Sequence, residues 1–432
     1  MSIKKILSNI KKKKVKVGII GMGYVGLPLA KSFVEKNINT YGFDIDQKKI
    51  KKLTQGVSYI NYFAHKEIKK MNKKNFTPTS NFSLIKEMDL IILCLPTPIK
   101  KDKSPDMFYI LSSLKTIFPY LRKNQTLSLE STTYPGTCEE VILPMLKKKF
   151  IVGKDFFLVY SPEREDPGNK KYSLLKIPKV LGGLTLNCKL LGKKFYSLLD
   201  VKLITVNDIK TAEFTKLLEN IYRSVNIGLI NEMKNICNKM NINIFDAIEA
   251  AGTKPFGFQK FYPGPGYGGH CIPIDPFILA WKAKKSGADA KFIRLSGVIN
   301  EQMPIKISKK IISYCLVKNE RNILIIGMAY KKNVDDLRES PAVQLINILQ
   351  KEKNLQINFY DPYIKKIDSR NKKFEHINYF NLDYNKLDKF DLVAILTDHD
   401  ILDYKKILKH SKIILDCRGR FFNVSDKKVI QS

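Results

Sequence analysis

The sequence has few of the residues that build metal sites and disulfide frameworks. Histidine occurs five times in 432 residues, and the seven cysteines are scattered, with no CxxC pair and no Cys/His pair at metal-ligand spacing. The cysteine count is also odd. These features argue against a disulfide framework and a structural zinc, so we expect no metal site and a reducing cytoplasm as the compartment.

Long apolar runs are missing as well. No uncharged run exceeds that from Val17 to Ala30, whereas a membrane-spanning helix needs about 20 residues. Residues 1–14 alternate lysines with single apolar residues and lack the continuous apolar core of a secretory signal. We therefore expect neither membrane insertion nor export.

Acidic residues are scarce relative to basic ones. The chain has 41 Asp and Glu against 75 Lys and Arg, which gives a net charge of +34. Such a charge suits a nucleic acid, an anionic membrane or an anionic small substrate. The lysines are spread over the whole chain, however, no usual nucleic-acid-binding motif is present, and Ile and Asn are also abundant. We interpret the charge as a compositional bias and expect no nucleic-acid partner.

What the chain does contain is short apolar runs separated by helical segments. Hydrophobic residues make up 44% and charged residues 27%, and 432 residues are too many for one ordinary domain. Apolar runs occur at residues 15–20, 40–43, 90–95, 126–129 and 156–160, and the pattern returns at 323–326, 357–360, 390–397 and 412–415. Between the two sets, residues 208–241 have no proline, one glycine and helical apolar spacing. The predicted fold class is α/β, with two Rossmann-like parallel-sheet domains joined by a long central helix.

A glycine-rich turn follows the first apolar run. Gly21 permits the tight turn, Gly23 lets the backbone approach a pyrophosphate, and Gly26 lets helix and strand pack closely. Asp44 ends the next predicted strand, 18 residues after Gly26, where an acid bonds the ribose hydroxyls and favours NAD over NADP. We therefore expect NAD as cofactor. The C-terminal half has only Gly327 at the equivalent turn, which favours a different nucleotide there.

A second glycine-rich segment, residues 264–275, surrounds one cysteine. The glycines flanking Cys271 are expected to expose it, and Asp275 follows four residues later as base or orienting group. A thiol beside a dehydrogenase cofactor adds to an aldehyde to give a thiohemiacetal, which a second hydride transfer converts to a thioester that water hydrolyses. We expect Cys271 to be a nucleophile and His270 to be structural or to contact the substrate.

The predicted central helix carries a cation and an amide on one face. Lys216 and Asn220 lie four residues apart, and together such groups stabilise an alkoxide or a tetrahedral oxyanion. Taken alone, a solvated helix face is the better explanation of the pair. Glu213 and Glu219 of the same helix are expected to be surface charges.

Two charged loops follow predicted strands. Residues 161–169 come after the run at 156–160, at the strand end where ligands bind in open α/β sheets. Residues 330–341 follow the first C-terminal strand and contain lysine and arginine side chains suited to a sugar-nucleotide diphosphate.

Taken in order, these motifs resemble the nucleotide-sugar 6-dehydrogenase family, from about Val15 to Phe421. The family includes UDP-glucose, GDP-mannose and UDP-N-acetylhexosamine dehydrogenases. The matching segments are GMGYVGLP (21–28), EST with PGT (130–132 and 135–137), SPER (161–164), Lys216 with Glu219 and Asn220, GGHC (268–271) with Asp275, and Lys331 with Asp336, Arg338, Ser340 and Pro341.

The resemblance implies roles for individual residues. The expected catalytic residues are Cys271, Lys216, Asn220, Asp275, Thr132 and Glu163, the last two ordering water and the catalytic shell. The expected cofactor contacts are Gly21, Met22, Gly23, Tyr24, Val25, Gly26, Asp44, Lys49, Thr97, Thr132 and Arg338. The expected substrate contacts are Glu163, Arg164, Lys216, Asn220, Arg223, Lys254, Tyr262, Gly264, Gly268 and Lys331.

The resemblance also implies a domain organisation. We expect an NAD-binding domain at 1–205, a central helical region at 206–312 that holds the dimer contact and the cysteine, and a UDP-sugar-binding domain at 313–432. A homodimer through the central helix, with further assembly left open, is the expected state.

Within the family, three segments look most like bacterial UDP-N-acetylglucosamine 6-dehydrogenases, which make UDP-N-acetylglucosaminuronic acid for surface polysaccharides such as O-antigen. These segments are 161–169, 177–183 and 253–269. UDP-glucose enzymes usually have Pro-Glu-Phe at 162–164 and lysine at Ile274. They also reach an arginine across the dimer, a role for which Lys254 is the candidate here.

The expected reaction is therefore a four-electron, NAD-dependent oxidation at C6 of UDP-N-acetylglucosamine. UDP-N-acetylmannosamine, UDP-N-acetylgalactosamine and UDP-glucose remain alternatives. A two-electron 3-hydroxyacid dehydrogenase and a basic nucleic-acid-binding protein with a Rossmann fold are the more distant ones.

Overall fold

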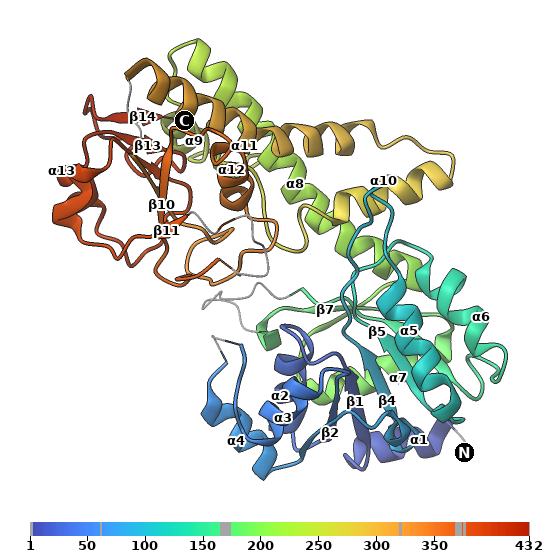
Figure 1. Ribbon diagram of the computed structural model, residues 1–432. Helices are drawn as coiled ribbons and strands as arrows, with labels where there is room; N and C mark the ends of the chain where they lie inside the picture. Colours follow the sequence, from blue (N-terminus) through green and yellow to red (C-terminus); the bar gives the residue numbers. More distant parts are fainter. Residues whose placement is uncertain are drawn as a thin grey trace. The chain divides into compact units, whose positions relative to one another are not determined.

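The computed structural model describes residues 3–60, 63–164, 174–318, 322–367, 374 and 377–431. The chain forms two compact units (Figure 1). Unit 1 comprises Met1–Glu219 and Trp281–Ala288, and unit 2 comprises Asn220–Ala280 and Asp289–Ser432. The helix α8 (Ile209–Lys239) begins in unit 1 and ends in unit 2, as predicted from the uninterrupted helical spacing of 208–241.

Unit 1 alternates strands and helices along the chain. Its elements are α1 (Ile3–Lys11), β1 (Lys16–Ile20), α2 (Gly26–Glu35), β2 (Asn39–Phe43), α3 (Gln47–Thr54), α4 (His65–Lys73), β3 (Phe76–Thr79), β4 (Leu90–Leu93), α5 (Phe108–Ile117), β5 (Thr126–Leu129), a π-helical turn (Cys138–Ile142), α6 (Leu143–Leu146), β6 (Phe157–Tyr160), β7 (Lys179–Gly183), α7 (Leu186–Tyr196), β8 (Leu203–Thr205) and the first part of α8.

The strands of unit 1 form one sheet in the order β3-β2-β1-β4-β5-β6-β7-β8. All pairs are parallel except β6 with β7, which run antiparallel. The order reverses between β1 and β4, and in open α/β sheets this switch point is where ligands bind beyond the carboxyl ends of the strands.

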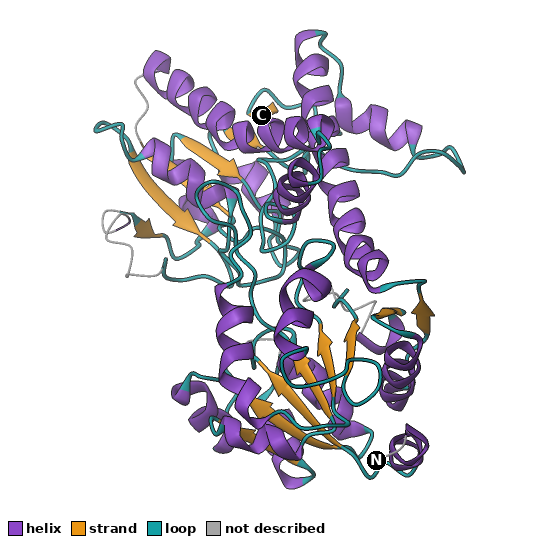
Figure 2. Ribbon diagram, turned by 90° about the vertical axis from the view of Figure 1, so that its right-hand side faces the viewer, coloured by secondary structure: helices purple, strands orange, loops and turns teal. Residues whose placement is uncertain are grey.

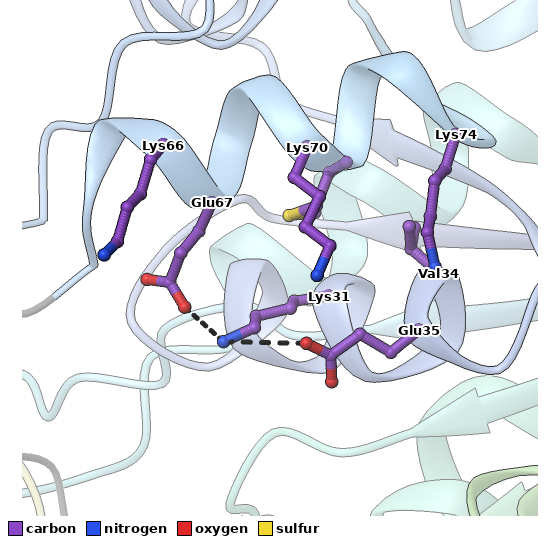
Figure 3. A pocket seen from close by; sticks show the side chains of 8 residues that line it. Lys31, Val34, Glu35, Lys66, Glu67, Lys70 and Lys74 are labelled. Atoms are coloured by element: carbon purple, nitrogen blue, oxygen red, sulfur yellow. Dashed lines mark hydrogen bonds and ion pairs between the residues drawn. The ribbon is translucent and has the colours of Figure 1, made fainter.

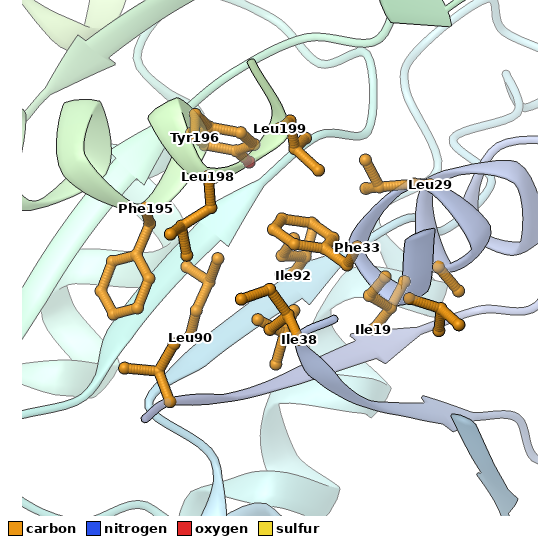
Figure 4. Close-up of a cluster of buried hydrophobic side chains, with 14 of the residues drawn as sticks. Ile19, Leu29, Phe33, Ile38, Leu90, Ile92, Phe195, Tyr196, Leu198 and Leu199 are labelled. Carbon is orange, nitrogen blue, oxygen red and sulfur yellow. The ribbon is translucent and has the colours of Figure 1, made fainter. Parts of the chain in front are cut away.

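Alternate residues of these strands feed two separate cores. Ile19, Leu90 and Ile92 join one cluster, with Phe33 of α2 and Phe195 of α7 (Figure 4). Ile20, Leu93 and Leu129 instead join a second cluster with side chains from α5 and α6. Because successive strand residues point to opposite faces, the sheet is covered by helices on both sides, as Figure 2 shows.

The N-terminal helix α1 had not been expected. Its lysines surround Ile6 and Ile10, which are buried in the first cluster. The alternation of lysine and apolar residues is therefore an amphipathic helix pattern, with Ile3, Ile6 and Ile10 on one face.

Unit 2 holds a second parallel sheet. Its elements are the remainder of α8, α9 (Ile244–Ala251), α10 (Asp275–Lys285, which ends in unit 1), α11 (Lys291–Lys318), β9 (Asn322–Ile326), α12 (Pro341–Leu349), β10 (Gln356–Tyr360), β11 (Asn378–Tyr379), β12 (Leu392–Ile395), α13 (Tyr404–His410), β13 (Ile414–Asp416) and β14 (Val429–Gln431).

The sheet of unit 2 repeats the topology of unit 1. Its order is β11-β10-β9-β12-β13-β14, all parallel, with the reversal between β9 and β12. Ile323 and Ile325 of β9 pack with α11 and α12, whereas Leu324 and Ile326 pack on the opposite face with Ile407 of α13. The predicted α/β class with two Rossmann-like sheets and a long central helix is confirmed. Within the described ranges, no helix combines the length and apolarity needed to cross a bilayer.

Candidate functional site

The glycine turn after β1 has the geometry that its sequence predicts. Gly21 adopts φ +96°, and a Cβ there would lie 2.3 Å from the Cys94 carbonyl oxygen. A Cβ on Gly26 would lie 1.9 Å from the Gly21 carbonyl oxygen, so the first turn of α2 packs directly on the loop. A Cβ on Gly23 would meet no chain atom within 4 Å, which leaves open space at the position expected to face a pyrophosphate. The turn therefore fits a dinucleotide.

Asp44 joins this turn to the end of β2. Its carboxylate accepts hydrogen bonds from the backbone N–H of Met22 and of Asp46, both at 2.9 Å. Lys49 lies 3.4 Å from the same carboxylate, because Asp46 caps α3 and so fixes the helix that carries Lys49. The structure thus brings together Asp44 and Lys49, the two residues predicted to contact the ribose.

Tyr59 is a residue of this turn that the sequence analysis missed. Its hydroxyl donates a hydrogen bond to the carbonyl oxygen of Met22, which fixes the second residue of the turn. The predicted contacts Tyr24 and Val25 lie half-buried in the same loop. No short motif marks Tyr59, since the contact joins residues 37 apart in the chain.

Further predicted residues lie at the same edge of the sheet in unit 1. Thr97 follows β4, Thr132 follows β5 and Glu163 follows β6. The Thr97 hydroxyl donates to the Thr132 carbonyl oxygen at 2.6 Å, which links two of the predicted cofactor contacts. The Glu163 side chain is 11% exposed and accepts from the backbone N–H of Arg164 at 2.7 Å. The remainder of the predicted loop, 165–169, lies outside the described residues.

Arg164 pairs with α8. Its guanidinium lies 2.7 Å from the Glu219 carboxylate and donates to the Pro178 carbonyl oxygen at 2.6 Å. Glu219 is therefore an ion-pair partner rather than the solvated surface charge expected from the sequence. Lys216, one turn earlier on α8, is only 7% exposed and is therefore largely removed from water.

The expectation of a surface position for Glu213 was wrong. This side chain is fully buried in unit 1 and accepts hydrogen bonds from the backbone N–H of Gly136 at 2.5 Å and of Cys138 at 2.9 Å. Burial raises the pKa of Glu213 to about 7, although the two N–H donors oppose the shift. The carboxylate ties α8 to the Pro135-Gly136-Thr137 turn, three residues before Lys216 on the helix. Periodicity could not reveal this, because it does not tell which face of a helix is covered.

In unit 2, three predicted residues form a chain of hydrogen bonds. The Asn220 amide donates to the Asp275 carboxylate at 2.5 Å, and Asn220 and Asp275 are 1% and 2% exposed. The Asn220 carbonyl oxygen accepts from the guanidinium of the exposed Arg223. Both polar atoms of Asn220 are thus engaged, which fixes the orientation of its amide.

The cysteine loop is held by the start of α10. The Asp275 backbone N–H donates to the Cys271 carbonyl oxygen at 2.9 Å, so the carboxylate follows the thiol by one turn. Cys271 is half-buried, as expected of a cysteine flanked by glycines. All seven cysteines fall within the described ranges, and none forms a disulfide. Burial and the charge of Arg338 lower the pKa of the neighbouring His270, which favours a neutral imidazole.

The glycines before Cys271 are required by a neighbouring aromatic ring. A Cβ on Gly268 would lie 2.6 Å from Tyr330, and a Cβ on Gly269 would lie 2.8 Å from the Tyr330 ring. The Gly269 N–H also donates to the Arg338 carbonyl oxygen at 2.9 Å. The loop after β9, which carries Lys331, is therefore packed against the cysteine loop within unit 2.

Arg338 itself forms an ion pair within its loop. Its guanidinium lies 2.6 Å from the Asp336 carboxylate, and its side chain is 46% exposed. Lys331 is half-buried with its ammonium 5.9 Å from the centre of the Tyr330 ring. Both cations were predicted to contact phosphate groups, and both lie in the loop after β9.

The remaining predicted substrate contacts differ in exposure. Gly264 is buried, and its N–H donates to the Asn231 side chain at 3.0 Å. A Cβ on Gly264 would lie 2.7 Å from the guanidinium of Arg418. Lys254 is exposed over the Phe256 ring, and the Tyr262 hydroxyl donates to Glu249.

The turn after β9 is not a copy of the one after β1. Asp361, which follows β10, is fully buried and accepts from the backbone N–H of Met328 and Ala329. The buried ring of His399 lies 3.0 Å from the same carboxylate, and the Asn333 N–H donates to its Nδ1 at 3.0 Å. The ring proton therefore lies on Nε2 and faces Asp361. Asp361 is thus the counterpart of Asp44, but it is fully buried against His399, whereas Asp44 is 7% exposed and lies beside Lys49. This difference is consistent with a different nucleotide.

A groove of about 330 Å³ lies elsewhere, between α2 and α4 of unit 1 (Figure 3). Its lining is Lys31, Val34, Glu35, Lys66, Glu67, Lys70, Met71 and Lys74, and Lys31 pairs there with Glu35 and Glu67. None of the predicted site residues lines it. Over the part of the chain that the structure describes, no group of three His, Cys, Asp or Glu side chains is arranged to hold a metal ion.

Three family models match the chain in succession. They are the NAD-binding domain of the UDP-glucose/GDP-mannose dehydrogenase family at residues 15–200, its central domain at 210–302 and its UDP-binding domain at 324–423. The first covers the glycine turn, the second covers Lys216 and Cys271, and the third covers Lys331 and Arg338.

Individual relatives match over nearly their whole length. Protein CapL of Staphylococcus aureus is 33% identical over 93% of this chain and 95% of its own. The UDP-N-acetyl-D-glucosamine 6-dehydrogenase of Pseudomonas aeruginosa is 34% identical over 83% of this chain and 85% of its own. The solved structure of the UDP-N-acetyl-mannosamine dehydrogenase Cap5O of S. aureus has a TM-score of 0.82 and 31% identity, covering 96% of this chain and 97% of that chain.

Proposed function

The chain belongs to the UDP-glucose/GDP-mannose dehydrogenase family, and on that basis we propose that it oxidises C6 of a UDP-N-acetylhexosamine to the uronic acid. The proposed substrate is UDP-N-acetyl-D-glucosamine. The observation that carries the proposal is the arrangement around the cysteine loop of unit 2, where Cys271 follows a Gly-Gly pair and Asp275 is clamped by Asn220. The family's NAD-binding domain supplies the cofactor site in unit 1.

We assign cofactor binding to the turn after β1 and its neighbours. Gly21 to Gly26 would hold the pyrophosphate, Asp44 and Lys49 the ribose, and Thr97, Thr132 and Arg338 further parts of the cofactor. Bound NAD supplies the hydride acceptor for both oxidation steps. The open space at Gly23 supports this assignment.

In the proposed mechanism Cys271 keeps the aldehyde on the enzyme. Its sulfur forms a bond to C6 of the aldehyde, giving a thiohemiacetal, and oxidation of that adduct gives a thioester. Water then adds to C6 and the C–S bond breaks, so that the sulfur leaves as thiolate and the sugar as carboxylate. Of the two protons of the water, one passes to the base assigned to this step and the other to solvent. Covalent capture means that a reactive aldehyde need not escape.

Lys216 and Asn220 are the proposed stabilisers of negative charge on the C6 oxygen. The burial of Lys216 and the fixed amide of Asn220 support this role, because pre-oriented donors in a dry site stabilise an oxyanion most. Asp275 orients Asn220 through their hydrogen bond. Thr132 and Glu163 are assigned to the water of the hydrolysis step.

We assign the contacts with the UDP-sugar residue by residue. The proposed contacts are Glu163, Arg164, Lys216, Asn220, Arg223, Lys254, Tyr262, Gly264, Gly268 and Lys331. The matched UDP-binding domain supports this assignment. We keep the division 1–205, 206–312 and 313–432 as the proposed functional domains.

A homodimer through α8 is the proposed assembly. Six apolar side chains on this helix, between 40% and 53% exposed, are Phe214, Leu218, Tyr222, Leu229, Met233 and Ile236. A continuous apolar helix face of this kind favours a partner surface over water. We further propose that the enzyme works in the cytoplasm and that its product feeds a surface polysaccharide.

UDP-N-acetylmannosamine is the second candidate substrate. The likeness to Cap5O, the UDP-N-acetyl-mannosamine dehydrogenase of S. aureus, supports it. The two sugars differ only in the configuration at C2, so the choice changes the specificity and not the mechanism.

The test compares wild-type protein with Cys271→Ser, using UDP-N-acetylglucosamine, its manno and galacto epimers, and UDP-glucose. We expect wild type to reduce NAD with UDP-N-acetylglucosamine and Cys271→Ser to bind the sugar nucleotide yet make no uronic acid. Cys237→Ser, on α8 outside the site, is the control and should remain active. Normal uronic-acid turnover by Cys271→Ser would refute the proposed mechanism.

A further inference from the structure

Three charged side chains lie together in the interior of unit 1. The Lys179 ammonium is 2.9 Å from the Glu130 carboxylate and 3.5 Å from the Glu163 carboxylate. The side chains of Lys179, Glu130 and Glu163 are 5%, 0% and 11% exposed. Lysine and glutamate are almost never buried this deeply unless they are paired. The sequence analysis gave no role to Lys179.

The antiparallel strand β7 places its first residue, Lys179, at the edge of the sheet where β6 ends. β6 pairs with β7 in the register Val159 opposite Gly183 and Tyr160 opposite Gly182. Continued past the end of β6, the same register sets Glu163 opposite Lys179. If β7 ran parallel to β6, its first residue would lie at the edge where β6 begins, away from Glu163.

Glu130 is held from its other side by α7. The Tyr196 hydroxyl donates to the Glu130 carboxylate at 2.5 Å and lies 2.7 Å from the Ser128 hydroxyl. The Lys179 ammonium lies 5.2 Å from the centre of the Tyr196 ring. Glu130 thus anchors the ammonium through its charge, and the Tyr196 ring covers it. Of this group, Glu163 belongs to the predicted site.

The cluster keeps its lysine protonated. Burial alone would lower the pKa of Lys179, but the charges of Glu130 and Glu163 outweigh burial and raise that pKa above its usual value. Burial raises the pKa of Glu130. Burial also raises the pKa of the adjacent Cys94 thiol, so this cysteine stays neutral. The electrostatic neighbours of Glu163 therefore include the Lys179 ammonium, the Glu130 carboxylate and the neutral Cys94 thiol.

We infer that Lys179 is a positioning residue for Glu163: its buried ammonium, anchored by Glu130, fixes the place of the Glu163 carboxylate, which the proposed function assigns to hydrolysis of the Cys271 thioester. This inference rests on the proposed function. In that step Glu163 accepts a proton from water, the water oxygen bonds to C6, and the C–S bond breaks to release the Cys271 thiolate. Lys179 touches neither substrate nor cofactor in this account.

The experiment separates thioester formation from its hydrolysis. Wild type, Lys179→Met, Lys179→Arg and Tyr196→Phe are mixed with UDP-sugar and NAD and quenched in acid, and the covalent adduct on Cys271 is measured by mass spectrometry. Tyr196→Phe is the matched control, because it disturbs the same buried cluster without removing a charge. Folding is checked by thermal unfolding.

For Lys179→Met we expect hydrolysis to slow about 10²-fold, the range of a lost general base, while the adduct accumulates and KM for the sugar stays within a few-fold. Lys179→Arg should recover part of the rate, and Tyr196→Phe should keep most of it. Hydrolysis within two-fold of wild type in folded Lys179→Met, or an equal loss in Tyr196→Phe, would overturn the inference.

Glu130→Gln gives an answer even where Lys179→Met does not fold. Removing the Glu130 charge takes away the anchor of the Lys179 ammonium, so hydrolysis should slow and the Cys271 adduct should accumulate while KM for the sugar stays within a few-fold. Hydrolysis within two-fold of wild type in folded Glu130→Gln would overturn the inference. A wild type that makes no uronic acid from any of the UDP-sugars would instead refute the proposed function.

Discussion

Asn220 and Asp275 are joined by a buried hydrogen bond of 2.5 Å, although they lie 55 residues apart in the chain. The bond connects α8 to the first residue of α10, directly after the cysteine loop. The bond therefore holds the Asn220 amide in one orientation. This is the amide to which we assign stabilisation of the oxyanion.

The first prediction concerns this bond. Asn220→Leu should lower kcat about 10²- to 10³-fold, because it removes an oriented donor. It should also lower the free energy of unfolding by about 1–3 kcal/mol, because the buried Asp275 acceptor loses a partner. Steady-state kinetics and urea unfolding measure the two effects. Asn187→Leu, which removes an exposed hydrogen bond to Gly153, is the control and should change neither by much.

The second prediction uses two glycines of one turn. Gly26→Ala should destabilise unit 1, since its Cβ would lie 1.9 Å from the Gly21 carbonyl oxygen. Gly23→Ala should fold normally, because its Cβ meets no chain atom within 4 Å, but it should lose NAD affinity, because the methyl group takes space assigned to the pyrophosphate. Thermal unfolding without cofactor and NADH titration distinguish the two. If Gly23→Ala binds NADH as wild type does, the cofactor is not where we assign it.

The third prediction concerns pH. The pKa of Glu213 is raised from 4.5 to about 7 by burial, so between these values the folded state binds more protons than the unfolded state. The stability contributed by this group is therefore present at low pH and falls as pH rises through that window, by at most about 3 kcal/mol. Glu213→Gln should flatten this part of the stability profile measured by urea unfolding. The same slope in the variant would show that Glu213 is not its source.

The fourth prediction tests the proposed dimer. Leu229 on α8 is 42% exposed and Leu190 on α7 is 38% exposed, so they form a matched pair for substitution by glutamate. Leu229→Glu should yield monomers in sedimentation, because it places a charge in the apolar face of α8. Leu190→Glu should sediment as wild type does. A dimer that survives Leu229→Glu, and likewise Leu218→Glu, would rule out the α8 face as the contact.

Local sequence patterns predicted the parts of the site that depend on local backbone. The glycine turn, the acid after β2 and the length of α8 all follow from signals within about 30 residues, and the structure confirms each of these elements. The catalytic, cofactor and substrate roles assigned to individual residues stay predictions.

What the sequence could not reveal depends on pairing between distant segments. The Lys179 cluster requires knowing that β7 runs antiparallel to β6 in an otherwise parallel sheet. Glu213 was predicted to be exposed because charged residues on helices usually are. The turn at residues 135–137 that covers it is distant in the sequence. Tyr59 was missed because its contact with Met22 joins residues 37 apart in the chain.

The most direct test of the account is to count NADH formed per sugar at complete conversion, with UDP-N-acetylglucosamine limiting and NAD in excess. A four-electron oxidation through a Cys271 thioester predicts two NADH per sugar and no aldehyde in solution. One NADH per sugar, with the aldehyde recovered by a trapping amine, would contradict it, because the thiol would then not retain the intermediate.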